Sequence, residues 1–263
     1  RDELQRFLIQ AQAEGYYELF LLDLATGLRR GELLALQWND LDFETGVLTI
    51  SKQVSLVRGK IVMSVPKTKS SIRKLVLPPA VVQVLKEYRE INVIGWSMGV
   101  WAATQVMGKL QETDTALVIK NSIAINGTPY PIDDTYGIPT AIYHGTLEGL
   151  TGPSLHKFLR RMCFNGEAFK EFLNITPRRP LEELKEELAE IERMYLSLPA
   201  TSFYWQQAVV GNNDRIIPPD NQLNAWRKEA EISRKTLRVH YTEDAHYQVE
   251  LFRYYLQEIW TKD

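Results

Sequence analysis

The sequence predicts an α/β protein with a parallel sheet, preceded by a smaller α+β part. From residue 91 onward, short apolar runs alternate with helical segments, which is typical of a parallel sheet covered by helices. Before residue 90, helical periodicity gives way to short β-like runs separated by turn residues, which favours an antiparallel sheet. We therefore expect two domains, over residues 1–90 and 91–263.

Composition limits the classes of protein that this chain can belong to. With 263 residues, of which 44% are hydrophobic, it can build one or two packed cores. The formal net charge is only −2, so the overall charge does not call for nucleic acid as a partner. Residues 51–90 are different, because they carry nine Lys or Arg and two Glu and thus predict a local basic patch.

The cysteine count, the lack of a long apolar segment and the first residue bear on where the protein is located and whether the sequence is complete. Cys163 is the single cysteine, so no internal disulfide can form and a reducing compartment is expected. No signal peptide and no apolar run of membrane-spanning length is found, and we expect a cytoplasmic protein without membrane contact. The chain does not begin with Met, which indicates an excised or incomplete piece.

The first ninety residues predict helices, a small sheet and a further helix. Residues 1–37 carry apolar side chains at helical spacing, with a break at Thr26-Gly27. Three β-like runs follow, over residues 47–50, 61–65 and 75–77, and predict a three-stranded antiparallel sheet. Pro78-Pro79 then opens a helix over residues 80–90, because proline is favoured in the first helical turn.

The remaining residues predict a parallel sheet with an inserted helical segment. Strands are expected over residues 91–94, 122–125, 208–210 and 237–241. The insert covers about residues 151–198, and it includes a charged amphipathic helix from residue 180 with Thr176 as its expected cap. Such an insert is typical of a lid over a site, and a solvated surface helix has the same pattern.

The segment Gly95-Trp96-Ser97-Met98-Gly99 has the form Gly-x-Ser-x-Gly. It lies between the first expected strand of this part and a helix-compatible segment, residues 100–110. A strand, a sharp turn and a helix are the context of a nucleophile elbow, and we expect both glycines to be needed for the tight turn. The motif predicts Ser97 as an acyl-transfer nucleophile.

A serine hydroxyl needs a base that is itself held by an acid. In serine hydrolases of the α/β type the chain order is Ser, Asp or Glu, His. Asp214 follows the third expected strand and His246 follows the fourth, so they are the expected acid and base. The rivals for the acid are Asp220 and Asp244. The other histidines are less well placed, because two precede the acid and one lies within a strand: His144, His156 and His240.

Three segments resemble the pimeloyl-acyl-carrier-protein methyl ester esterases of biotin synthesis, in their compact α/β-hydrolase form. They are residues 94–103 (IGWSMGVWAA), 124–139 (AINGTPYPIDDTYGIP) and 155–163 (LHKFLRRMC). The resemblance covers about residues 88–263. It implies a truncated α/β-hydrolase-like parallel sheet with a helical lid, and hydrolysis of a methyl ester on a pimeloyl chain carried by acyl carrier protein.

The same resemblance implies roles for individual residues. Ser97 would be acylated, His246 would act as base and then acid, and Asp214 would orient His246. The amide N–H of Met98 would supply one oxyanion donor. Arg160 and Arg161, on the insert, would meet acidic groups or the phosphate of the carrier protein, and a solvated helix face is the alternative interpretation. No cofactor and no metal is expected.

Two segments of the first ninety residues resemble the catalytic domain of tyrosine recombinases, the phage integrases. They are residues 25–42 (ATGLRRGELLALQWNDLD) and 66–73 (PKTKSSIR). The resemblance implies that Arg29 clamps the scissile phosphate and that Lys67, with Lys69 as its rival, protonates the leaving oxygen.

The rest of the recombinase machinery is missing from the sequence. None of the four histidines has an arginine three residues later, and no late tyrosine stands in a recognisable context. Strand cleavage is therefore not expected, and the alternative function is weak, salt-sensitive DNA binding through residues 51–90.

Joining the two parts also affects the esterase. The hydrolase strands that normally precede the elbow, and the second oxyanion donor that they supply, are not found before Ser97. We expect an impaired esterase whose first strand, residues 91–94, is an unprotected sheet edge. A third hypothesis is a composite of two truncated genes without integrated activity.

Overall fold

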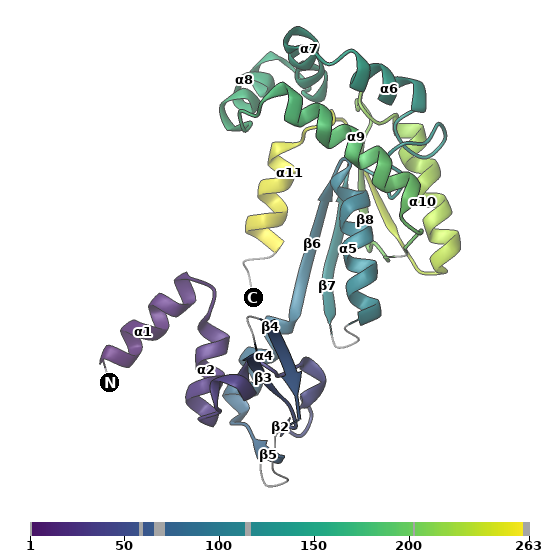
Figure 1. Cartoon of the computed structure of the whole chain (residues 1–263). Coiled ribbons are helices and arrows are strands. Elements are labelled where there is room, and N and C mark those ends of the chain that lie inside the picture. Colours follow the sequence, from purple (N-terminus) through teal and green to yellow (C-terminus); the bar gives the residue numbers. More distant parts are fainter. Residues whose placement is uncertain (1, 58–59, 66–71, 114–116, 202, 260–263) are drawn as a thin grey trace. The chain divides into compact units, whose positions relative to one another are not determined.

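The computed structural model describes residues 2–57, 60–65, 72–113, 117–201 and 203–259 of the chain (Figure 1). The chain divides into two compact units. The first comprises Arg1–Ile91 and Asp114–Val118, and the second comprises Asn92–Thr113 and Ile119–Asp263. No helix among the described residues is both long enough and apolar enough to cross a bilayer.

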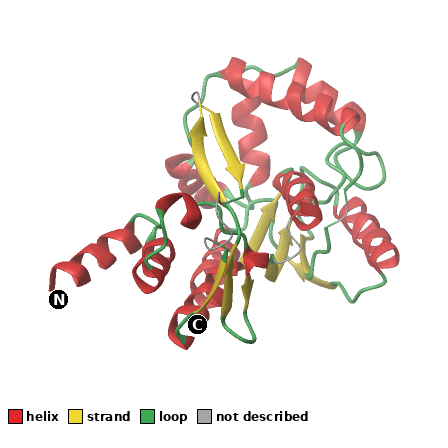
Figure 2. Cartoon of the chain, turned by 60° about the horizontal axis from the view of Figure 1, so that its bottom comes forward, coloured by secondary structure: helices red, strands yellow, loops and turns green. Residues whose placement is uncertain are grey.

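The first unit contains four α-helices and five strands within its described residues. The helices are α1 (Asp2–Ala13), α2 (Tyr17–Thr26), α3 (Arg30–Leu33) and α4 (Pro79–Arg89). The strands, drawn in yellow in Figure 2, are β1 (Leu41–Asp42), β2 (Val47–Ile50), β3 (Gln53–Val57), β4 (Lys60–Ser64) and β5 (Arg73–Val76). A 3₁₀ turn, Trp38–Asp40, precedes β1.

The three predicted β-like runs are all strands, but they do not form one sheet. β2 pairs with β1 and β5 in an antiparallel sheet, with Val47 opposite Val76. β4 pairs instead with β3, with Leu56 opposite Ile61, in a separate two-stranded hairpin. Adjacent segments pair at little loop-closure cost, which favours this local hairpin.

The core of the first unit lies between β2 and α4. Alternate residues of β2, Leu48 and Ile50, are 2% and 0% exposed. They pack with Val81 and Leu85, which are four residues apart and therefore lie on one face of α4. The buried residues repeat every two positions in the strand and every three to four in the helix, so each element presents one apolar face to the other.

The second unit is built on a four-stranded sheet in the order β6-β7-β8-β9. Its strands are β6 (Glu90–Trp96), β7 (Val118–Ile125), β8 (Gln207–Gly211) and β9 (Arg238–Thr242). β8 pairs in parallel with β7 and with β9, as the alternating pattern predicted. β6 lies at one end of the described sheet, so the expectation that it is an edge strand is confirmed.

Three further helices lie between or after these strands. They are α5 (Gly99–Thr113), α10 (Pro219–Ser233) and α11 (Val249–Arg253), the last of which continues into a π-helical segment, Tyr254–Ile259. α10 packs against β8. The central strand β8 is buried from Ala208 to Gly211, which is typical of a parallel strand covered on both faces.

The helical insert lies between β7 and β8. It consists of α6 (Thr140–Glu148), α7 (Gly152–Met162), α8 (Gly166–Ile175) and α9 (Leu181–Ser197), and Figure 1 shows all four gathered beyond one end of the sheet. The insert was predicted from residue 151, and α6 extends it toward the N-terminus.

The expectation that Thr176 caps the charged helix is wrong. Thr176 ends α8 instead, and its hydroxyl donates to the Phe172 carbonyl at 2.6 Å. Pro177 follows it, and a residue before proline is pushed toward extended backbone, so the helix cannot continue. α9 begins only after Pro180.

Candidate active site

Ser97 lies on a sharp turn between β6 and α5. Its φ is +54°, in the left-handed region that a non-glycine residue rarely adopts. The turn is fixed by the Ser97 N–H, which donates to the Ile125 carbonyl at 3.1 Å, and by the Val100 N–H, which donates to the Ser97 carbonyl at 3.1 Å. The strand, strained turn and helix expected of a nucleophile elbow are therefore present.

The two glycines of the motif are not equally constrained. A Cβ at Gly95 would lie 2.8 Å from the Trp205 ring and 2.9 Å from the Val100 Cα, so a side chain cannot fit there. A Cβ at Gly99 would meet nothing outside its own helix. The expectation that both glycines are needed for the tight turn is therefore wrong for Gly99, because α5 has already begun at that residue.

Asp214 and His246 form a buried pair. The Nδ1 atom of His246 lies 2.8 Å from the Oδ2 atom of Asp214, and the two side chains are 1% and 0% exposed. Asp214 follows β8 and His246 follows β9, so parallel pairing brings both loops to the carboxyl edge of the sheet. The rival acids Asp220 and Asp244 are exposed.

The Asp214 carboxylate is surrounded by donors. Its Oδ1 atom accepts hydrogen bonds from the backbone N–H groups of Ile216 at 2.8 Å and Ile217 at 3.1 Å. Its Oδ2 atom accepts a further bond from Gln222 Nε2 at 2.8 Å. Gln222 is 0% exposed on α10, and it was not predicted, because a glutamine in the first turns of a helix gives no sequence signal of a buried role.

The other three histidines have different partners. His240 lies 3.0 Å from the Gln207 side chain, and His144 lies 2.6 Å from Glu192 across α6 and α9. The His156 ring packs edge-on against Phe169. Among the four, His246 is the one that contacts the acid at the carboxyl edge of the sheet.

The loop that carries His246 is fastened to the elbow strand and to the insert. The indole N–H of Trp96 donates to the His246 carbonyl at 2.9 Å, and the two rings are 5.5 Å apart. The Tyr247 N–H donates to the carbonyl of Met162, at the end of α7, at 2.8 Å. The residue before Ser97 thus contacts His246 directly, while the Ser97 hydroxyl itself makes no hydrogen bond with a described residue.

An apolar cluster adjoins the elbow. Trp96 and Met98 pack against buried residues from the insert, from the loop after β7 and from the loop after Asp214: Ile132, Ile138, Tyr143, Met162, Cys163, Phe169, Phe172, Ile216 and Ile217. Burial raises the pKa of the Cys163 thiol, which favours its neutral form. The Met98 backbone N–H has no hydrogen-bond acceptor among the described residues, so it remains able to donate.

Arg160 and Arg161 lie in the last turn of α7, and both are exposed. Their guanidinium groups lie over the rings of Phe169 and Phe158, at 5.8 and 5.9 Å from the ring centres. The structure does not bring these arginines into contact with Asp214 or His246. They form instead a basic, aromatic-backed surface on the insert.

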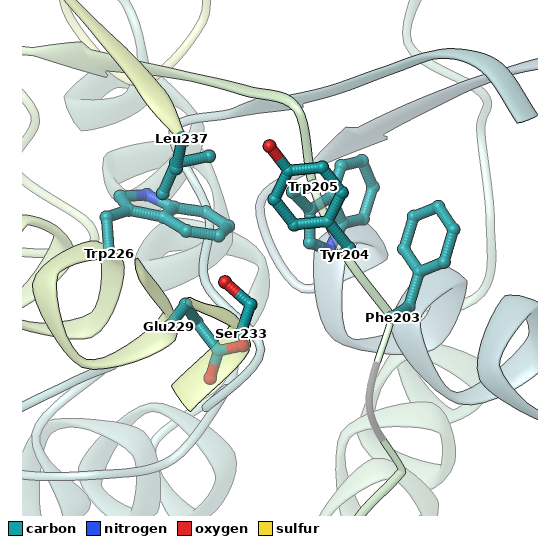
Figure 3. A pocket seen from close by; sticks show the side chains of 7 residues that line it. All are labelled: Phe203, Tyr204, Trp205, Trp226, Glu229, Ser233 and Leu237. Carbon is teal, nitrogen blue, oxygen red and sulfur yellow. The ribbon is translucent and has the colours of Figure 1, made fainter. Parts of the chain in front are cut away.

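A small cavity of about 10 Å³ lies elsewhere in the second unit (Figure 3). Its lining is mostly aromatic and contains none of the residues predicted for the site: Phe203, Tyr204, Trp205, Trp226, Glu229, Ser233 and Leu237. Figure 3 shows Trp226 and Leu237 facing the aromatic run from Phe203 to Trp205. The cavity has room for about one water molecule and is too small for an acyl chain.

In the first unit, Arg29 is the N-cap of α3 and its side chain is 79% exposed. Its guanidinium lies 3.5 Å from Glu32, whose side chain is 2% exposed. Glu32 also accepts two hydrogen bonds from Arg73, at 3.0 and 2.9 Å. These bonds lower the pKa of Glu32 to about 2. Lys67 and its rival Lys69 lie outside the described residues.

Comparison with known proteins matches the two parts of the chain to two different families, and the two matches overlap over residues 81–101. Residues 81–249 match the family model described as pimeloyl-ACP methyl esterase BioG, and residues 2–101 match that of the phage integrase family. Among solved structures, BioG from Haemophilus influenzae is 35% identical, with a TM-score of 0.53, over 64% of this chain and 72% of that one.

Two curated relatives show how partial the matches are. The malonyl-[acyl-carrier protein] O-methyltransferase of Bacteroides fragilis is 51% identical over 160 residues, which are 61% of this chain and 32% of that protein. A tyrosine recombinase XerC-like protein of Caldanaerobacter subterraneus is 44% identical over 97 residues, which are 34% of this chain and 25% of that protein. The chain thus spans about a third and a quarter of their lengths.

The family match over residues 81–249 includes the elbow, the Asp214–His246 pair and the insert, and the integrase match covers the first unit's α3 and its Arg29. The chain is therefore a two-part protein that belongs to the BioG pimeloyl-ACP methyl esterase family and carries a phage-integrase-family region before it.

Proposed function

We propose that this chain is a serine esterase that hydrolyses the methyl ester of pimeloyl-acyl carrier protein. The observation that carries the proposal is the buried hydrogen bond between Asp214 and His246, on the loops that follow two neighbouring parallel strands. Together with the strained Ser97 elbow, this pair supplies the three groups that acyl transfer needs.

The mechanism follows from the chemistry of these groups. His246 takes the proton of the Ser97 hydroxyl through Nε2, and the Ser97 oxygen attacks the ester carbonyl carbon. The tetrahedral intermediate collapses when His246 returns the proton to the methoxy oxygen, so methanol leaves and pimeloyl-Ser97 remains. Water, deprotonated by His246, then hydrolyses this acyl-enzyme. Asp214 holds Nδ1 and stabilises the imidazolium that forms in each step.

The surroundings of the elbow fit an acyl chain on a carrier protein. The apolar cluster beside Trp96 and Met98 offers apolar side chains to the methylene groups of the pimeloyl chain. Arg160 and Arg161 are exposed cations on the same insert, which suits the acidic surface or the phosphate of a carrier protein.

The oxyanion site limits the expected rate. The free Met98 N–H is one donor, and hydrolases of this fold take a second donor from a loop that precedes the elbow strand. Residues 2–80, which precede the BioG match, have the pattern of the recombinase part instead. Because one missing oxyanion donor costs about 10²- to 10³-fold in rate, we expect slow turnover.

The test is hydrolysis of methyl-pimeloyl-acyl carrier protein by the full chain. Intact-protein mass spectrometry measures it, because each hydrolysed ester lowers the mass of the acyl carrier protein by one methylene unit. The wild type should convert the substrate, and Ser97→Ala should not. Ser197→Ala, which changes an exposed serine at the end of α9, is the matched control and should retain the wild-type rate. Equal conversion by wild type and Ser97→Ala would refute the proposal.

A second function, DNA binding by the first unit, is favoured by the 79% exposure of the Arg29 side chain within the integrase-family region. Part of the basic segment is already engaged, since Lys52 lies 3.5 Å from Asp40 and Arg73 is bonded to Glu32. Weak binding is therefore expected. A duplex gel shift at rising salt tests it, and Lys67→Ala with Lys69→Ala should weaken the shift. Binding that is unaffected by salt would contradict it.

A further inference from the structure

We propose that Asn126 is a positioning residue that fixes the His246 loop against the loop carrying Asp214. The inference rests on the proposed esterase function, because it assigns a role toward the proposed base. Asn126 directly follows β7 and is 0% exposed. Its φ is +43°, in the left-handed region where asparagine is one of the few tolerated residues.

The side chain of Asn126 bridges the two loops. Its Oδ1 atom accepts a hydrogen bond of 2.7 Å from the Gly211 N–H, at the end of the strand before Asp214. Its Nδ2 atom donates to the carbonyls of Ala245 and His246, at 2.8 and 2.9 Å. An N–H partner on one side and two carbonyls on the other leave a single consistent orientation of the amide.

The backbone of the same turn extends this connection to the elbow. The Asn126 N–H donates to the Val209 carbonyl at 2.9 Å, which ties the turn to β8. A Cβ at the next residue, Gly127, would lie 2.3 Å from the Ser97 carbonyl oxygen. Residues 126 and 127 therefore lie against all three chain segments that carry the proposed triad.

The His246 carbonyl receives two side-chain donors, one from Asn126 and one from Trp96. Fixing this peptide fixes the direction of the bond from Cα to Cβ in His246, and with it the position of the imidazole. One imidazole nitrogen must hydrogen-bond to Asp214 while the other faces the serine. A shift of about 1 Å in such a group costs on the order of 100-fold in rate.

Isosteric substitution separates this role from mere packing. Asn126→Asp keeps an acceptor for the Gly211 N–H but removes both bonds to Ala245 and His246. Asn126→Ala removes all three side-chain bonds. Ser122→Ala is the matched control, because Ser122 is also 0% exposed on β7 and bonds the Gln206 N–H at 2.9 Å, away from the two loops.

The first measurement is the rate at which a fluorophosphonate labels Ser97, per folded molecule, from pH 5 to 9. Asn126→Asp and Asn126→Ala should both slow labelling on the order of 10- to 100-fold and move the midpoint of its pH dependence. Ser122→Ala should lose stability but keep the wild-type rate and midpoint. Equal losses in Asn126→Ala and Ser122→Ala, or a wild-type rate and midpoint in Asn126→Asp, would overturn the inference.

A second measurement does not depend on esterase activity. The ring NMR signals of His246, identified by their loss in His246→Gln, report its pH titration directly. They should titrate differently in both Asn126 variants and as in the wild type in Ser122→Ala. If the wild type is not labelled at Ser97, the proposed function fails while this titration still decides the role of Asn126. An unchanged His246 titration in both variants would refute that role.

Discussion

Asp214 and Glu32 are both buried carboxylates, one in each unit of the chain, but their partners differ. Asp214 is hydrogen-bonded to His246, and histidine is the side chain that most often transfers protons in catalysis. Glu32 is hydrogen-bonded to Arg73, which stays charged at every relevant pH. The first pair can take part in proton transfer, whereas the second can only hold structure in place.

The residues around the two carboxylates differ as well. The Asp214 carboxylate holds a histidine whose loop also contacts the residue before a strained serine. Glu32 accepts the Arg29 N–H at 3.1 Å and thereby fixes the start of α3, from which the Arg29 side chain extends into solvent. The second unit thus contains a buried acid–histidine pair beside the serine turn, whereas the first unit contains a single exposed arginine held by Glu32.

The largest effect that would test this contrast comes from Asp214→Asn. We expect ester hydrolysis to fall about 10⁴-fold, because the amide stabilises the wrong tautomer of His246 and cannot stabilise an imidazolium. The measurement is the rate of methanol release from the methyl ester. Asp244→Asn changes an exposed acid of the neighbouring loop and should leave the rate unchanged. If both variants were equally active, Asp214 would not be the acid.

Gly95→Ala should have the next largest effect. The new Cβ would clash with the Trp205 ring and the Val100 backbone, and displacement of the elbow should lower hydrolysis on the order of 100-fold. Gly99→Ala, in the first turn of α5, should keep the rate and raise thermal stability slightly, because alanine is the better helix former. Equal losses in the two variants would show that the elbow is constrained in a different way.

Gln222→Leu should have a smaller effect of about tenfold on hydrolysis. It removes one hydrogen bond to the Asp214 carboxylate while the two backbone donors remain. Gln206→Leu, which removes an exposed side-chain bond to Lys120, is the control and should hydrolyse at the wild-type rate. A Gln222→Leu variant with full activity would show that the backbone donors alone hold the acid.

Glu32→Gln should change stability and leave hydrolysis unaffected. The pKa of Glu32 is about 2 in the folded chain against an ordinary 4.5, so its ion pair stabilises the fold fully above about pH 4.5. That contribution is lost as the pH falls from 4.5 toward 2. Hydrogen exchange of peptides from α3 and β5, corrected for intrinsic rates, should show this loss in the wild type and not in Glu32→Gln. A changed rate of ester hydrolysis in Glu32→Gln would contradict the conclusion that Glu32 has only a structural role.

Much of the fold followed from local patterns in the sequence. The four strands of the parallel sheet were predicted because each is a short apolar run with turn residues at its ends. β3 was missed, since its residues are half-buried or exposed and form no continuous apolar run that would mark them as a strand. The cap at Thr176 was predicted wrongly because the proline after it outweighs the side chain's preference for capping.

The candidate site was predictable only in part. The order Ser97, Asp214, His246 is readable along the chain, but the burial that separates Asp214 from Asp220 and Asp244 exists only in three dimensions. Asn126 and Gln222 gave no usable signal. An asparagine before glycine has the pattern of an ordinary turn, and only the structure brings its amide between two distant loops.

Covalent labelling of Ser97 tests the central claim most directly. The full chain is treated with a fluorophosphonate, and the labelled peptide is located by mass spectrometry in wild type and in Ser97→Ala. If the Asp214–His246 pair activates Ser97, the wild type should carry one label, on the peptide that contains Ser97. The Ser97→Ala variant should carry none. A wild-type chain that takes no label, or a Ser97→Ala chain labelled to the same extent, would contradict it.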